Sequence, residues 1–117
     1  MAQRPSERRA EERIDVDLEA TLTSGGTSRN CRILNICSNG FLLEANQHIG
    51  VGEVAELRAC LTPGQAVTCT VEIKHVNAHR RGAMVIGMND ADMKRYRRFI
   101  EEERASQMEA RSRSRAG

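Results

Sequence analysis

Alternation of apolar and polar residues is the feature of this sequence that most restricts its fold. It is clearest in residues 14–22, where Ile, Val, Leu, Ala and Leu alternate with Asp, Asp, Glu and Thr. A period of two places the apolar side chains of a β-strand on one face and the polar ones on the other. The same alternation returns in residues 55–61 and 67–73. These three segments predict strands with one buried and one solvent-exposed face.

Three shorter apolar runs complete the predicted set of strands. Residues 31–34, 41–43 and 83–88 are β-prone and bounded by turn residues. Asn39-Gly40 lies just before the second run and predicts a type I′ hairpin turn, because both residue types tolerate the positive φ that this turn requires. By itself, this pattern indicates an ordinary β-hairpin.

After residue 88 the apolar period changes to that of a helix. Asn89 or Asp90 can cap the first turn, and Asp92 suits the positive end of the helix dipole. Four apolar residues then share one helical face: Met93, Tyr96, Phe99 and Ile100. We expect this face to pack on the sheet.

Six short strands followed by one helix predict an all-β fold, a small six-stranded antiparallel β-barrel with a C-terminal α-helix, because a small sheet removes its edges by closing. We expect three segments in the chain: a flexible Arg-rich arm over residues 1–13, the barrel and helix over 14–104, and a disordered Arg/Ser tail over 105–117.

Composition restricts the function as well as the fold. With 117 residues and 39% hydrophobic content, the chain can build one modest core. Aromatic residues make up 3%, too few for the stacking platforms of single-strand nucleic-acid binders, and the net charge of +2 permits an anionic partner without requiring one. No apolar run is long enough to cross a membrane, so we expect a cytoplasmic protein. The four cysteines lack metal-site spacing and are interpreted as reduced thiols.

Two groups of polar residues are candidates for binding. Arg8, Arg9 and Arg13 lie in the arm, where Glu11 and Glu12 offset part of their charge. A solvated charged segment is the plain interpretation of this arm. In the hairpin, Asn35 and Cys37 alternate on one strand and therefore point to the same face; a flat base could be read there by hydrogen bonds. Gly40 leaves the backbone without steric cover.

An Arg-x-x-x-Arg arm, an antiparallel barrel and an Asn-x-x-x-x-Gly segment together resemble the PilZ domain family of bacterial cyclic di-GMP receptors. The resemblance runs from Arg8 to about Glu102 and rests on four positions: Arg9, Arg13, Asn35 and Gly40. It implies that these residues, with Arg8 and Cys37, bind cyclic di-GMP. The family usually has Ser where this chain has Cys37, and a thiol is the poorer hydrogen-bond partner.

The resemblance also implies how the protein would act. In such proteins, an Arg just before the arginine pair is associated with two bound nucleotides per chain. Arg8 occupies that position here. The arm would close over the ligand and signal to an effector protein, with no cofactor and no enzymatic activity. An adaptor with a weakened or absent nucleotide site is the alternative that Cys37 leaves open. A nucleic-acid binder is disfavoured because glutamates are interleaved with the arginines and no reading helix is visible.

Overall fold

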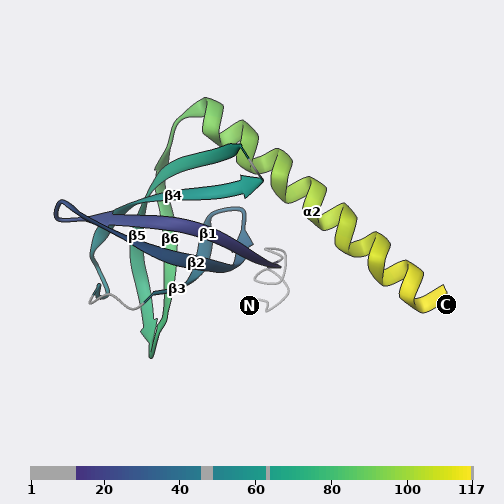
Figure 1. Ribbon diagram of the computed structural model, residues 1–117, viewed down its shortest axis with the longest axis horizontal. Coiled ribbons are helices and arrows are strands. Elements are labelled where there is room, and N and C mark those ends of the chain that lie inside the picture. The colour runs from purple at the N-terminus through teal and green to yellow at the C-terminus, as the bar shows by residue number, and fades with distance from the viewer. Residues whose placement is uncertain (1–12, 46–48, 63, 117) are drawn as a thin grey trace, which may run out of the picture.

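Six antiparallel strands close into a barrel and one long helix packs against it in the computed structural model (Figure 1). The structure describes residues 13–45, 49–62 and 64–116. The strand order around the barrel is β1-β2-β3-β6-β5-β4, and β4 pairs with β1 to close it. The predicted fold class is confirmed. The elements are β1 (Ile14–Ser24), β2 (Thr27–Cys37), β3 (Gly40–Glu44), β4 (Val54–Thr62), β5 (Gln65–Asn77), β6 (Arg80–Met88) and α2 (Asp90–Ala116).

The core forms from the apolar halves of the alternating segments. In β4 every second residue is buried from Ala55 to Leu61, and in β5 from Val67 to Ile73. Leu57 of β4 has no exposed surface. Burying a side chain of this size contributes about 1.5–3 kcal/mol, so the alternation fixes which face of each strand points inward.

The β1–β2 hairpin is longer than the sequence indicated because of its turn. Gly25 and Gly26 both have positive φ, 59° and 82°, and Ser24 pairs directly with Thr27. A two-residue turn of this kind matches the twist of the strands it joins. As a result β2 begins at Thr27, before the apolar run starts at Cys31.

The β2–β3 hairpin is at the predicted place, but its turn differs from the prediction. Cys37 pairs with Gly40, so the central residues of the turn are Ser38 and Asn39. Neither they nor Gly40 belong to the described residues with positive φ, so the expected type I′ geometry at Asn39-Gly40 is wrong. The glycine is needed in the strand and not in the turn, for a reason given below.

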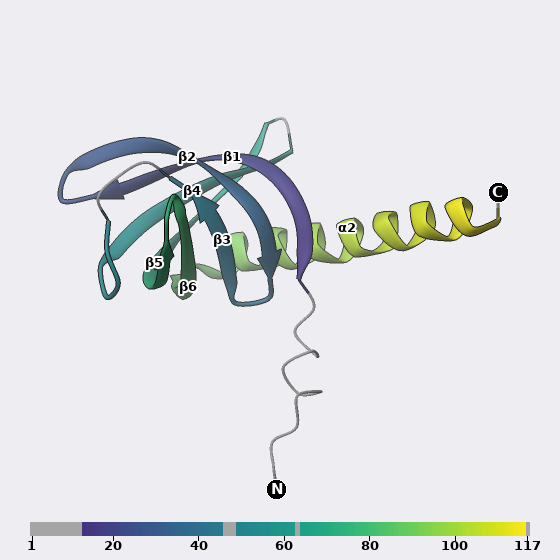
Figure 2. The ribbon, with the colours of Figure 1, turned by 90° about the horizontal axis from the view of Figure 1, so that it is seen from below.

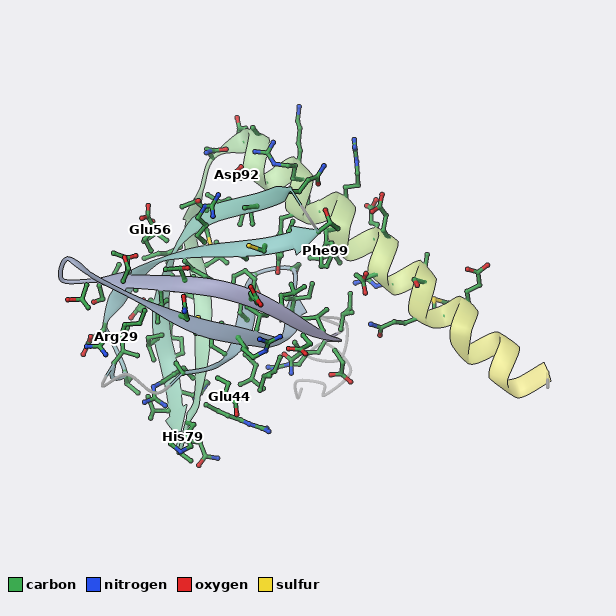
Figure 3. The ribbon with its side chains drawn as sticks, in the orientation of Figure 1. Arg29, Glu44, Glu56, His79, Asp92 and Phe99 are labelled. Atoms are coloured by element: carbon green, nitrogen blue, oxygen red, sulfur yellow. The ribbon has the colours of Figure 1, made fainter. Side chains whose placement is uncertain are left out.

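Helix α2 packs on the barrel with the face that its periodicity predicted. Tyr96, Phe99 and Ile100 are all buried, and Figure 3 shows Asp92 and Phe99 on the part of α2 nearest the barrel. The helix continues to Ala116, so the disordered Arg/Ser tail that the sequence predicted after residue 104 is wrong for residues 105–116. Residues 105–116 contain no Gly or Pro and many good helix formers, which accounts for the longer helix.

The first turn of α2 is fixed to β5 by Asp92. Asn89 caps the helix by accepting the Asp92 N–H at 2.8 Å, and the Asp92 carboxylate accepts the Thr68 N–H at 3.1 Å. Arg95 also donates to this carboxylate. The Thr68 hydrogen bond, helped by Arg95 and Asn89, holds the pKa of Asp92 below its usual range.

Replacing Asp92 should therefore destabilise the protein at neutral pH more than in acid. A lowered pKa in the folded state means that this stabilisation is present above the unfolded pKa and is lost as pH falls through the folded pKa. We expect Asp92→Asn to reduce the free energy of unfolding at pH 7 by about 1.5–3 kcal/mol, with the difference from wild type shrinking towards pH 2. Urea unfolding at both pH values measures this. The exposed Asp90 provides the control, Asp90→Asn; equal losses in the two variants would contradict the assigned role of Asp92.

Candidate functional site

A depression on the outer surface of β2, β3, β5 and β6 collects the motif residues that the structure describes. It has a volume of about 420 Å³. Arg13, Asn35 and Cys37 line one side of it, which we call the Arg13 end. We call the whole hollow the Asn35 depression. The rest of its lining is Asn39, Gly40, Phe41, Leu42, Lys74, His75, Asn77, Arg80, Gly82, Ala83 and Met84.

The Arg13 end joins the start of β1 to the hairpin. Asp15 pairs with Asn35 across β1 and β2, which brings the residue before β1 next to the hairpin strand. Arg13 Nη1 donates to Asn35 Oδ1 at 3.5 Å. Arg13 is exposed and Asn35 half-buried, so both can meet a bound molecule. Arg8 and Arg9 fall outside the described residues.

Cys37 shares the face of Asn35, as the alternation predicted. Its thiol is half-buried and lies 3.5 Å from Asn39 Oδ1 and 3.7 Å from the carbonyl oxygen of Gly40. The side chain therefore points into the Asn35 depression and not into the core, where Ile36 lies fully buried. A hydroxyl at this position would find the same two acceptors.

Gly40 is required by the packing of two strands. It is buried in β3 and pairs with Met84 of β6. A Cβ added to Gly40 would lie 2.7 Å from the carbonyl oxygen of Ala83, a distance that backbone atoms cannot relieve without moving. The sequence predicts that Gly40 exposes the backbone to the ligand. The structure gives it a further task, which is to let β3 and β6 approach.

Helix α2 supports the hairpin from behind. The hydroxyl of Tyr96 donates to the carbonyl oxygen of Cys37, and the Tyr96 ring is tilted against Phe41, with the ring centroids 5.5 Å apart. Burial, with smaller contributions from Cys37 and Cys69, raises the pKa of the Tyr96 hydroxyl far above its usual value. The hydroxyl therefore stays protonated and remains a donor to the hairpin.

Three residues at the opposite side of the Asn35 depression were not predicted from the sequence. Lys74 and His75 come from β5 and Arg80 from the start of β6; we call this side the Arg80 end. A β-bulge between Ile73 and His75 leaves both Lys74 and His75 exposed. The only sequence signal was the basic character of the turn that precedes β6.

Charge distinguishes the Asn35 depression from a larger hollow over β1, β2 and β4. The larger hollow, of about 510 Å³, is lined by both carboxylates and arginines, and its Arg32 is paired with Asp17 at 2.6 Å. The described lining of the Asn35 depression contains Arg13, Lys74 and Arg80 and no carboxylate; of these three cations, Lys74 is paired with Glu72, which lies outside the lining. The Asn35 depression is therefore the better site for an anion.

The described residues include no helix that is both long and apolar enough to cross a membrane. Their carboxylates, thiols and imidazoles form no cluster of three that could hold a metal ion. The guanidinium, ammonium, amide and imidazole groups that line the Asn35 depression offer hydrogen bonds and charge.

Comparisons with known proteins agree with this architecture. The sequence matches the PilZ domain over residues 7–102. Among solved structures, the Bacillus subtilis inhibitor of motility MotI/DgrA has a TM-score of 0.69 at 12% identity, covering 93% of this chain and 53% of that one. MrkH of K. pneumonia in its apo state has a TM-score of 0.73 at 12% identity, covering 94% and 56%. This chain thus spans about half the length of each, and the likeness shows the fold alone. The sequence has no match among curated proteins.

Proposed function

The chain belongs to the PilZ domain family, and we propose that it is a cyclic di-GMP receptor that signals to a protein partner through a change in its N-terminal arm. The observation that carries this proposal is the Asn35 depression itself. It places Arg13 and Asn35 in contact at one end of a hollow whose described lining has three cations and no carboxylate.

The chemistry of the ligand fits these groups. Cyclic di-GMP carries two phosphates and two guanines. A guanidinium binds phosphate in a bidentate manner and can also pair with the O6 and N7 atoms of guanine, and an amide such as that of Asn35 can donate to and accept from a base edge. Arg13, with Arg8 and Arg9 from the arm, supplies the guanidinium groups.

Ordering the arm is the main cost of binding in this proposal. Fixing each backbone residue costs about 1–2 kcal/mol, and each charge-assisted hydrogen bond contributes about 1.5–3 kcal/mol. Three arginines making several such bonds can offset the ordering of a short arm, which leaves a net affinity in the micromolar range or better. The closure of the arm is then itself the signal.

Two hydrogen bonds connect helix α2 to the segments on either side of the Arg13 end, where the arm would close. Tyr96 holds the Cys37 carbonyl of the hairpin, and Gln107 Nε2 donates to the Asp15 carbonyl at 2.9 Å, two residues after Arg13. Both sides of the Arg13 end are thus attached to α2, whose later turns extend beyond the barrel (Figure 2). We propose that these turns form part of the surface offered to the partner.

Isothermal titration calorimetry tests the receptor function directly. We expect saturable binding of cyclic di-GMP, weaker binding of the linear GMP dinucleotide because it is not preorganised, and no binding of a short DNA duplex. A folded protein that gives no binding heat with cyclic di-GMP at several temperatures would refute receptor function. It would favour the second candidate, an interaction adaptor without a nucleotide site. The observation that favours this candidate is Cys37, a thiol at the position where the family usually has Ser.

Cys37→Ser separates these two candidates further. Because the side chain points into the Asn35 depression near two acceptors, a hydroxyl should be accommodated and should bind the ligand at least as tightly as the thiol. Calorimetry gives the affinity, and thermal unfolding should show an unchanged midpoint. Weaker binding together with a lower midpoint would contradict the assignment of Cys37 to the ligand face.

The number of bound nucleotides depends in this proposal on Arg8. Two stacked cyclic di-GMP molecules bring four phosphate charges together, and a third guanidinium can offset that repulsion while stacking on a base. We expect a ratio of two nucleotides per chain, falling to one in Arg8→Leu. The calorimetric stoichiometry measures this ratio. Saturation of the unmodified chain at one nucleotide, or an unchanged ratio of two in the variant, would contradict the role given to Arg8.

A further inference from the structure

One cross-strand row connects the two ends of the Asn35 depression. Asn35 of β2 pairs with Leu42 of β3, Leu42 with Gly82 of β6, and Gly82 with His75 of β5. Neighbouring strands lie about 4.7–4.9 Å apart, so Asn35 and His75 are separated by roughly 14 Å along this row. The depression therefore has room for a ligand with two recognition groups, one at each end.

Gly82 leaves room on the floor of the row for the side chain of His75. A Cβ at Gly82 would lie 3.1 Å from Cδ2 and 3.4 Å from Cβ of His75, which is tighter than nearly all real contacts. The imidazole of His75 thus lies over the glycine, along the surface of the sheet. It presents a flat aromatic group at the Arg80 end, in a protein in which aromatic residues are rare.

Arg80 is held at the rim by its neighbour. Arg81 is buried and donates from Nε to the Ile49 carbonyl at 2.9 Å and from Nη1 to the Ala78 carbonyl at 2.7 Å. These bonds fasten the tip of the β5–β6 hairpin, which Figure 3 marks by His79. Because side chains alternate along a strand, a buried Arg81 directs Arg80 to the outer face. The described residues include no ion pair that engages Arg80, although Glu44 is its cross-strand neighbour.

We propose that the Arg80 end is a guanine subsite, in which Arg80 binds the O6 and N7 edge of one guanine and His75 provides the surface on which that base stacks. The inference rests on the proposed receptor function and deepens it. The Arg13 end takes the first half of the ligand, and the Arg80 end selects the base of the second half. Lys74 also lies beside this subsite, where it is paired with Glu72 at 3.4 Å.

The choice of guanine follows from the donors present. An arginine fork donates two parallel hydrogen bonds, and guanine presents two adjacent acceptors, O6 and N7, on one edge. Adenine presents one acceptor and one donor on the same edge, so the fork would meet an N–H group instead. Stacking on His75 is tolerant of the base, because every base has an aromatic face. Arg80 therefore confers selectivity, and His75 confers affinity.

Cyclic di-AMP provides the matched ligand for the test, since it keeps both phosphates and the ring but has no guanine. We expect the unmodified chain to bind cyclic di-GMP more tightly than cyclic di-AMP. Arg80→Ala should weaken cyclic di-GMP by about tenfold to a hundredfold and cyclic di-AMP much less, which reduces the preference by about tenfold or more. His75→Ala should weaken both ligands by a similar factor, about tenfold.

Two further variants control for the loss of a positive charge and for the loss of the planar guanidinium group of Arg80. Arg58→Ala removes an exposed arginine from β4, outside the Asn35 depression, and should change neither affinity. Arg80→Lys keeps the charge without the planar fork and should lose most of the preference. An unchanged affinity for cyclic di-GMP in Arg80→Ala, or equal weakening of both ligands, would overturn the guanine subsite. The receptor function itself fails only if the unmodified chain does not bind cyclic di-GMP.

Discussion

Arg13→Ala is expected to abolish binding of cyclic di-GMP at ligand concentrations that saturate the unmodified chain, and to leave the fold intact. Arg13 donates to Asn35 at the rim of the Asn35 depression and is exposed. Loss of a bidentate guanidinium removes two charge-assisted hydrogen bonds, each contributing about 1.5–3 kcal/mol, so affinity should fall at least about a hundredfold. The same result is expected for Arg9→Ala, whose position lies outside the described residues. Calorimetry provides the affinity.

The melting temperature decides whether such a loss is specific. Arg13 precedes β1 and belongs to no part of the buried core, so Arg13→Ala should unfold at the temperature of the unmodified chain. Arg58→Ala is the matched control for the removal of one exposed arginine and should bind normally. If Arg13→Ala lost cooperative unfolding, the arginine would be structural. If it bound with unchanged affinity, the Arg13 end would not be part of the nucleotide site.

Gly40→Ala is expected to destabilise the barrel and to weaken ligand binding together. The added methyl group would meet the Ala83 carbonyl oxygen at 2.7 Å, so β3 and β6 must separate at the centre of the Asn35 depression. Overpacking of this kind costs about 1–3 kcal/mol. Urea unfolding should show a loss of that size, and binding should weaken because Arg80 and Met84 on β6 move relative to Asn35.

Gly87→Ala is the control on β6, the strand that carries Ala83. Its added Cβ would lie 3.8 Å from the nearest atom, a Thr70 side-chain carbon, which is an ordinary contact, and Gly87 has no positive φ. This variant should be as stable as the unmodified chain. A Gly40→Ala protein with full stability would contradict the account of Gly40 as a contact between strands. If Gly40→Ala were fully stable but bound the ligand weakly, Gly40 would serve only to let the ligand approach the backbone.

Most of the fold could be predicted because the periodicity is regular. The alternation in β1, β4 and β5 specified their buried faces, and Tyr96, Phe99 and Ile100 specified the packed face of α2. Turn details were harder to predict, because Asn39-Gly40 has a hairpin signature while the pairing of Cys37 with Gly40 moves the turn back by one residue. The end of α2 was also predicted wrongly. Residues 105–116 are low in complexity, which indicates disorder, but they are also good helix formers.

Some residues of the candidate site could likewise be predicted from the sequence, and others could not. Asn35, Cys37 and Gly40 could be found because they are close in sequence, and the structure places all three with Arg13 around one depression. His75 and Arg80 could not, because only the β3–β6 and β5–β6 pairings bring them to it. Periodicity predicts which face of a strand is buried but says nothing of which strands are neighbours. The long-range order β3-β6-β5 had to be observed.

The most direct test of the central claim is a titration of ¹⁵N-labelled protein with cyclic di-GMP, followed by amide NMR shifts. The receptor account predicts saturable shifts concentrated in two segments, residues 35–42 and 74–84, together with Arg13. The mixed-charge hollow around Arg32 and Arg58 should remain unchanged. Shifts confined to that hollow, or no shifts at ligand concentrations far above micromolar, would contradict the proposal that the Asn35 depression is the nucleotide site.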